Sequence, residues 1–317
     1  MQKSISLIAS YTLALMFFVV TDVPAVDMLL VTDTNASKVY GVDPVTGNKT
    51  LLISPTDNPW GITTDSSSNV YIAMQVNGGS GYVQKYAPTF TSSSTLVSGL
   101  VIPYDVALNS QNELGVSNGN KVQKYNSSTG TAIGSEITAG GILGSLKSIG
   151  YDSSNNLYAL NTAIPPFGTI YKFDSSGTED TSFATNVGSL NNAGGLFVSA
   201  NSVYYTQGTN LVKTDLSGIK DNSFGTNGVV PLTVSGWGIR SIGNTLYVGL
   251  GGTTIGTFNA TTGALINAEF ATGFSQTFYM TTFTTPVPEP STYALGAIAS
   301  GVMAYVARRR RHQKATA

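Results

Sequence analysis

Few side chains in this sequence are able to do chemistry. The 317 residues include no cysteine and one histidine, His312, which lies within the last six residues. Cysteine nucleophiles, zinc fingers, disulfides and Ser-His-Asp triads are therefore excluded over the bulk of the chain. Between residues 26 and 285, ten Lys and Arg side chains stand against fifteen Asp and Glu, a net charge of −5 with no basic stripe. A nucleic-acid partner is therefore not expected.

The more informative residues are aromatic. Trp60, Tyr104 and Trp237 each open a short apolar run, and Arg240, the only arginine between residues 26 and 285, follows Trp237 closely. Aromatic faces beside a few polar groups are typical of a site for carbohydrate or peptide. Phe167 belongs to the longest apolar loop and is expected on the same face. These five residues are the predicted ligand-binding set, and packing between structural repeats is the alternative.

No catalytic residue and no metal site is predicted. A divalent cation needs several carboxylates that converge from different strands. Asp105 alone lies where an inner strand is expected to begin. This region has four glutamates, and by repeat position three of them fall in turns or outer strands; the four are Glu113, Glu136, Glu179 and Glu269. We therefore expect no cofactor, no bound metal and no enzymatic activity.

Two further patterns have plain structural interpretations. Ser- and Asn-rich turns begin at three aspartates and lack the later Glu and the fixed Gly of a calcium loop, so Asx turns are expected; they start at Asp65, Asp152 and Asp174. Three lysines recur at one repeat position and are expected on a solvated strand face rather than in a binding strip; they are Lys85, Lys124 and Lys172.

The elements that must position these residues come from one repeat. Copies such as PWGITTDSSSNVYIAM and LKSIGYDSSNNLYALN alternate β-rich runs with turn clusters, and corresponding positions recur every 43 to 46 residues; those positions are Tyr71, Gly115, Tyr158, Tyr204 and Tyr247. Several short strands per copy indicate propeller blades. A partial copy opens the region, and residues 274–283 look like its missing strand. We predict an all-β, six-bladed β-propeller over 26–285, with four-stranded antiparallel blades and a ring closed by N- and C-terminal strands. A seventh blade would have to be hidden near 91–98 or 178–192.

The blade pattern resembles NHL-type repeats, in the form P-x-G-I-x-x-D, then N-V-Y-I, then V-x-K-Y. The best match runs from Pro59 to Tyr86, while Gly115 and Thr214 depart from the aromatic positions. The resemblance implies the propeller fold and little about the ligand, because such folds bind proteins, RNA and small molecules alike.

The two ends are sorting signals. Residues 1–25 combine Lys3, an apolar run and Val23-Pro24-Ala25, which is the pattern of a secretory signal peptide and predicts export through the Sec translocon. Residues 286–317 hold a Pro-rich stretch, an apolar stretch from Tyr293 to Ala307 and a basic run, Arg308, Arg309, Arg310 and Arg311. Fifteen apolar residues give about 22 Å of helix, short for a hydrocarbon core of about 30 Å, so this transmembrane helix suits transient insertion.

Val287 to Thr292, with Pro288-Glu289-Pro290 at the centre, closely resembles the PEP-CTERM sorting tag of Gram-negative bacteria that make exopolysaccharide. The resemblance implies recognition by a membrane-embedded exosortase, cleavage, and transfer to the cell surface or extracellular matrix. We predict a non-catalytic binding or structural module, for exopolysaccharide or a surface protein. The alternative is a lactonase-like, metal-dependent hydrolase with a degenerate site.

Overall fold

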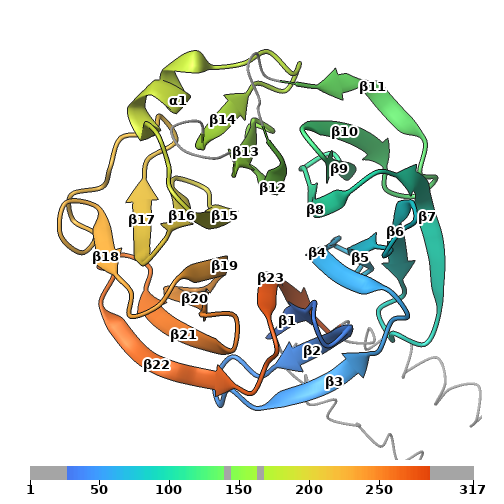
Figure 1. Ribbon diagram of the computed structural model, residues 1–317, viewed down its shortest axis with the longest axis horizontal. Helices are drawn as coiled ribbons and strands as arrows, with labels where there is room; N and C mark the ends of the chain where they lie inside the picture. The colour runs from blue at the N-terminus through green and yellow to red at the C-terminus, as the bar shows by residue number, and fades with distance from the viewer. Residues whose placement is uncertain (1–26, 139–143, 163–167, 286–317) are drawn as a thin grey trace, which may run out of the picture. The chain divides into compact units, whose positions relative to one another are not determined.

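A ring of six β-sheets surrounds a central channel in the computed structural model, which describes residues 27–138, 144–162 and 168–285 (Figure 1). Val26–Pro286 form one compact unit. The prediction of a six-bladed all-β propeller is confirmed. The predicted signal peptide, the sorting tail with its transmembrane helix, and Phe167 lie outside the described residues. Within the described ranges, no helix is long and apolar enough to cross a membrane.

Each blade is an antiparallel sheet whose strands follow one another from the channel outward. Blade 2 contains β4 (Asn58–Thr64), β5 (Val70–Gln75), β6 (Gly81–Tyr86) and β7 (Ser93–Leu100). Blade 3 contains β8 (Pro103–Leu108), β9 (Glu113–Asn118), β10 (Lys121–Asn126) and β11 (Ala132–Ile137). Blade 5 contains β15 (Ala193–Val198), β16 (Val203–Gln207), β17 (Asn210–Thr214) and β18 (Val229–Pro231). Blade 6 contains β19 (Gly236–Ile242), β20 (Thr245–Leu250), β21 (Thr254–Asn259) and β22 (Leu265–Thr272).

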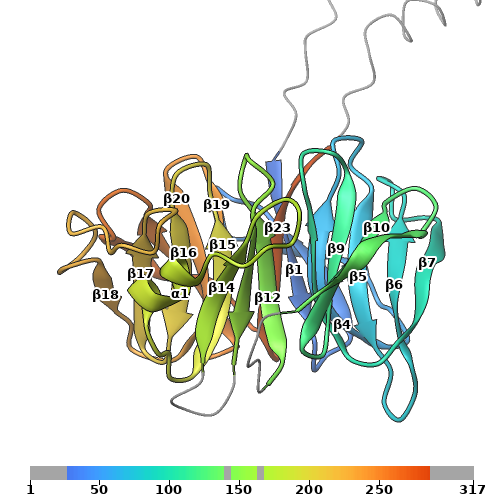
Figure 2. The same ribbon diagram turned by 90° about the horizontal axis from the view of Figure 1, so that it is seen from above.

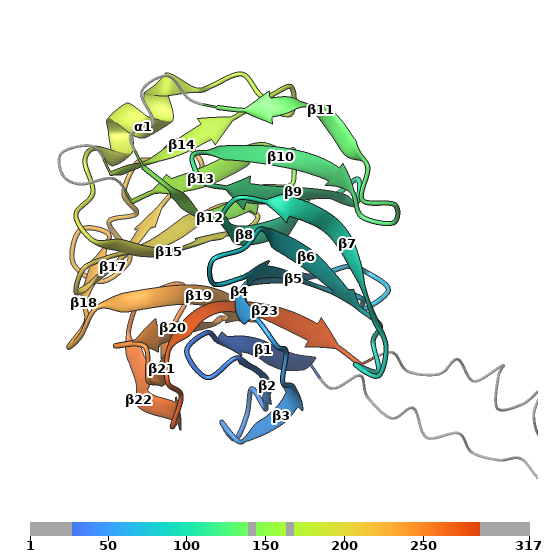
Figure 3. The same ribbon diagram turned by 45° about the vertical axis from the view of Figure 1, so that its right-hand side comes forward.

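Blade 1 closes the ring with strands from both ends of the described chain. It contains β23 (Thr277–Thr284), β1 (Asp27–Asp33), β2 (Lys38–Val42) and β3 (Lys49–Ile53), in that order from the channel. β1 pairs antiparallel with β23, with Asp27 opposite Thr284, and Figure 3 shows the two strands side by side. The predicted closure is confirmed, and both ends of the described chain lie at one rim of the propeller.

Blade 4 departs from the pattern. It has three strands, β12 (Leu146–Tyr151), β13 (Leu157–Asn161) and β14 (Thr169–Phe173), and α1 (Thr181–Val187) packs on the outer side of β14 (Figure 2). Asp180 caps the helix by accepting a hydrogen bond from the Ser182 backbone N–H, and Phe183 is fully buried. The region suspected of hiding a seventh blade holds this helix instead, while residues 93–98 belong to β7.

The hydrophobic core lies between neighbouring blades rather than in the channel. A tyrosine in the second strand of four blades links each blade to the next, because its hydroxyl donates to a backbone carbonyl in a turn of the following blade. These pairs are Tyr71 to Ser127 at 3.2 Å, Tyr158 to Leu216 at 3.3 Å, Tyr204 to Ala260 at 2.9 Å and Tyr247 to Pro44 at 2.9 Å. The recurring tyrosines of the repeat are therefore links between blades.

Candidate ligand-binding site

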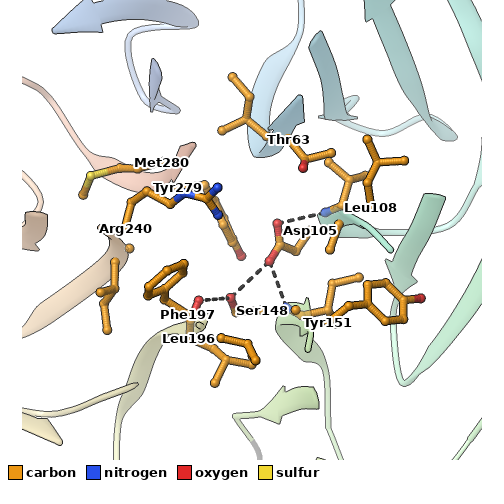
Figure 4. A pocket seen from close by; sticks show the side chains of 18 of the residues that line it. Thr63, Asp105, Leu108, Ser148, Tyr151, Leu196, Phe197, Arg240, Tyr279 and Met280 are labelled. Carbon is orange, nitrogen blue, oxygen red and sulfur yellow. Dashed lines mark hydrogen bonds between the residues drawn. The ribbon is translucent and has the colours of Figure 1, made fainter. Parts of the chain in front are cut away.

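A cavity of about 390 Å³ occupies one half of the central channel. All six inner strands contribute to its lining, which includes Thr63, Asp105, Ser148, Phe197, Arg240 and Tyr279 (Figure 4). It reaches the rim where the inner strands end, because the last residues of β4, β8, β12 and β15 belong to its wall. We call this cavity the cup. The described chain also begins and ends at this rim.

The floor of the cup lies near the places where inner strands of neighbouring blades approach each other closely. A Cβ on Gly61 would lie 2.3 Å from the Cα of Asp105, and a Cβ on Gly195 would lie 2.2 Å from the Trp237 carbonyl oxygen. Only glycine fits such approaches of backbone to backbone. The hydroxyl of Tyr279, on β23, donates to the Lys147 carbonyl on β12, the strand on the opposite side of the ring. The Tyr279 side chain therefore crosses the channel and forms the floor of the cup.

The predicted aromatic residues lie on the far side of this floor. Trp60 and Tyr104 make an edge-to-face contact at 5.3 Å, and Trp60 lies 6.3 Å from the Tyr279 ring. Neither they nor Trp237 lines the cup. All three lie near the start of their inner strands, and we call them the aromatic layer. Trp60 packs against the hydrophobic cores on both sides of its blade. Of the four members of the predicted set that the structure describes, Arg240 alone lines the cavity.

Arg240 projects from β19 into the cup, half-buried. Its Nη2 donates to Thr282 Oγ1 at 3.1 Å, and its Cζ lies 5.2 Å from the centre of the Phe197 ring. Its Nε is buried without a hydrogen-bond partner, and among the described residues no carboxylate forms a salt bridge with it. Burial lowers the pKa of Arg240 to about 10, so the guanidinium stays charged at neutral pH. The cup thus holds one positive charge that no described carboxylate neutralises.

Asp105 lies in β8, in the blade opposite that of Arg240. Its Oδ1 accepts from the Val106 N–H at 2.8 Å, and its Oδ2 accepts from the Ile149 N–H at 2.9 Å and from Ser148 Oγ at 3.1 Å. The residue is 5% exposed. Burial raises the pKa of Asp105 to about 7, although these hydrogen bonds oppose the shift. A carboxyl group with this pKa exchanges its proton near neutral pH, as a general acid or base must. Asp105 lies on an inner strand, as its position in the repeat predicted, but no chemistry was expected of it.

The donor set does not fit the divalent metal of lactonase-like propellers. In the described ranges, no group of three His, Cys, Asp or Glu side chains comes together. Asp105 is the one carboxylate in the lining of the cup, and donor hydrogens already occupy both of its oxygens. Hard cations want several oxygen ligands, so these residues do not support a reaction step through a metal.

The other patterns singled out in the sequence have structural roles. Asp65 Oδ1 accepts from the backbone N–H groups of Ser67 and Asn69, which confirms the Asx turn. The recurring lysines lie beside the recurring tyrosines on the neighbouring strand: the Lys85 Nζ is 5.1 Å from the Tyr71 ring centre. Lys124 departs from this because glycine stands at 115, and it pairs with Glu113 at 3.1 Å. These lysines support blade contacts and form no binding strip.

With the geometry established, comparison with known proteins identifies the C-terminal segment. Residues 286–311 match the PEP-CTERM protein-sorting motif. The chain therefore carries the sorting signal of an exported, surface-associated protein, which implies processing by an exosortase. No curated protein matches the chain.

Among solved structures, the chain is similar to a protein described as a putative gluconolactonase. The two are 13% identical, the match covers 57% of this chain and 67% of the other, and the TM-score is 0.46. At this level the likeness concerns part of the fold and gives the chain no activity. The prediction that the chain is not an enzyme is nevertheless wrong in the light of this neighbour, and we withdraw it. That prediction rested on counting histidines and paired carboxylates, which overlooks how burial changes a single aspartate such as Asp105.

Proposed function

We propose that the chain is an exported propeller, sorted to the cell surface or extracellular matrix, that binds a small molecule or the end of a longer chain in the cup. The observation that carries this proposal is the closed floor of a cavity of about 390 Å³ containing an unneutralised guanidinium. Ligand sites are typically cavities of about 300–1,000 Å³ with a few placed polar groups. A blind cavity of this size suits a small ligand better than a folded protein partner.

Sorting supports the same proposal. The Sec translocon would export the chain, the C-terminal helix would hold it transiently in the membrane, and exosortase would release it to the surface or matrix. There the most abundant ligand would be exopolysaccharide, and the aromatic layer of Trp60, Tyr104 and Trp237 would serve mainly to close the floor of the cup.

Binding in the cup is tested by filling it. The melting midpoint of the full chain is measured with D-glucose, D-galactose and their uronic acids, because a ligand that binds only the folded state raises the midpoint. We expect at least one sugar to raise it, and Thr63→Trp, which fills the cup, to abolish the rise. Thr95→Trp, on the exposed outer strand β7, is the matched control. No response to any sugar, or an unchanged response in Thr63→Trp, would contradict the proposal.

Asp105 favours a second candidate function, hydrolysis of an ester or lactone without a metal. Its carboxylate would take a proton from water as the water oxygen bonds to the carbonyl carbon, and the proton would pass to the leaving oxygen as the C–O bond breaks. Tyr151, Tyr279 and Arg240 are the other ionisable groups of the lining, and all three keep their protons near neutral pH. Hydrolysis of glucono-1,5-lactone in a pH-stat should therefore rise as pH increases through about 7, and Asp105→Asn should abolish it. A rate equal to the uncatalysed one at every pH removes this candidate.

A further inference from the structure

We propose that the cup is selective for a singly charged carboxylate on a hydroxyl-rich frame, the chemistry of a terminal sugar acid on a polysaccharide, with Arg240 binding the carboxylate. This inference rests on the proposed binding function and names the ligand class for the same site. Different features of the cup set the sign of the ligand charge, its magnitude, the rest of the ligand, and the requirement for a chain end.

The sign of the charge follows from Arg240. A guanidinium taken out of water is costly unless an anion pairs with it, and among the described residues no carboxylate does so. Thr282 Oγ1 accepts from only one of its nitrogens, while Phe197 packs 5.2 Å from its Cζ. The remaining N–H donors form a planar fork, which matches a carboxylate in two-point contact.

The magnitude of the charge follows from the rest of the wall. Arg240 is the single cation in the lining of the cup, and Asp105 stands in the opposite blade. A phosphate ester near neutral pH would bring close to two negative charges against one guanidinium and beside this carboxyl. A carboxylate brings one. Lys147 is the other Lys or Arg on the inner strands, but it lies on the other side of the floor, 5.9 Å from the Tyr104 ring centre.

The frame of the ligand follows from the remaining lining. Thr63 and Ser241 place hydroxyl groups in the wall, whereas the Ser148 hydroxyl already donates to Asp105. Hydroxyls donate and accept hydrogen bonds to other hydroxyls. An aliphatic or aromatic acid would leave the hydroxyls of Thr63 and Ser241 without a partner on the ligand, at a cost in affinity.

The requirement for a chain end follows from the closed floor. The Tyr279 side chain crosses the channel from β23 to β12, on the opposite side of the ring. A polymer is therefore unable to pass through, and only its terminal unit, or a one-unit branch, enters the cup.

The test is calorimetric titration of the full chain with D-glucuronate, D-glucuronamide, D-glucose and inorganic phosphate. Glucuronamide keeps the shape of glucuronate and removes its charge. We expect binding of glucuronate, and binding of the other three that is weaker by about tenfold to a hundredfold, the range for losing a hydrogen-bonded charge. Arg240→Gln should weaken glucuronate by the same factor and leave glucose unchanged. Lys147→Gln, which removes the cation on the far side of the floor, is the matched control and should change nothing.

The outcomes separate this inference from the function on which it rests. Equal affinity for glucuronate, glucuronamide and glucose, all lost in Thr63→Trp, would overturn the carboxylate selectivity and keep the cup as a binding site. Loss of glucuronate binding in Lys147→Gln but not in Arg240→Gln would overturn the inference, and it would place the binding site beyond the floor, beside Lys147 and Tyr104. Stronger binding of phosphate than of glucuronate would overturn the single-charge argument. Circular dichroism checks that each variant is folded.

Discussion

The chemistry of the cup depends on a single substitution in the repeat. Where three other inner strands have glycine, at positions 61, 195 and 238, the third blade has Asp105. Gly61 leaves room for it, since a Cβ there would lie 2.3 Å from Asp105 Oδ1. The glycines of the repeat therefore create a space that one blade fills with an ionisable side chain.

The burial of Asp105 predicts a specific dependence of stability on pH. Its pKa is about 7 in the folded chain against 3.8 ordinarily, so between pH 4 and 7 the unfolded chain loses this proton first. The contribution of Asp105 to the free energy of unfolding is therefore fully present below pH 4 and declines as pH rises through 7, by about 4 kcal/mol in total. Chemical denaturation from pH 5 to 8 should show this decline in the free energy of unfolding. Asp105→Asn should remove the dependence on pH, whether the variant is on average more or less stable than the original chain. Asp221, whose pKa its hydrogen bond with Lys213 lowers to about 2, titrates outside this window. Equal slopes for the two proteins would contradict the assignment.

Among single residues, the sequence predicted Arg240 as a site residue but did not predict the other residues that line the cup. Trp60, Tyr104 and Trp237 were expected at a binding mouth, and the structure places them beyond the floor. Strand alternation shows which residues face the channel, but the floor depends on Tyr279 reaching from β23 to β12 across the ring. That contact comes from the arrangement of whole blades, which a linear pattern does not contain.

The strands were predictable because the same strand pattern occurs in several copies of the repeat. Turn clusters bound each β-rich run, and the tyrosines that recur at 71, 158, 204 and 247 mark the second strand, where their hydroxyls link neighbouring blades. The outer strands carry less signal, since they bury fewer side chains: Ser93–Leu100 has two buried residues. In blade 4, α1 therefore replaces an outer strand without loss of the core contacts, because Phe183 supplies the buried side chain.

For the whole molecule, the number of blades follows from the length of the repeat, and the position of the cup's opening follows from ring closure. Inner strands run in one direction around the channel, so β23, the last, ends at the rim where the cup opens. Because Asp27 pairs with Thr284, both ends of the described chain lie at that rim. A ligand would then enter the cup from the rim at which the described chain begins and ends.

Ring closure by β1 and β23 predicts that a covalent bond between these strands stabilises the entire propeller. The chain has no cysteine, so Asp27→Cys with Thr284→Cys offers only one intramolecular disulfide, between Cα partners of the two strands. Closing a loop of about 250 residues restricts the unfolded chain by roughly 5 kcal/mol in the chain-entropy model, and engineered bonds often deliver less. We expect the melting midpoint to rise by about 5 °C or more on oxidation and to return with reductant, in one cooperative transition. Each single-cysteine variant is the control. If the disulfide forms but raises the midpoint of only one part of a multi-step unfolding curve, the six blades do not unfold as a unit. The pairing of β1 with β23 would then stabilise blade 1 alone and not the whole ring.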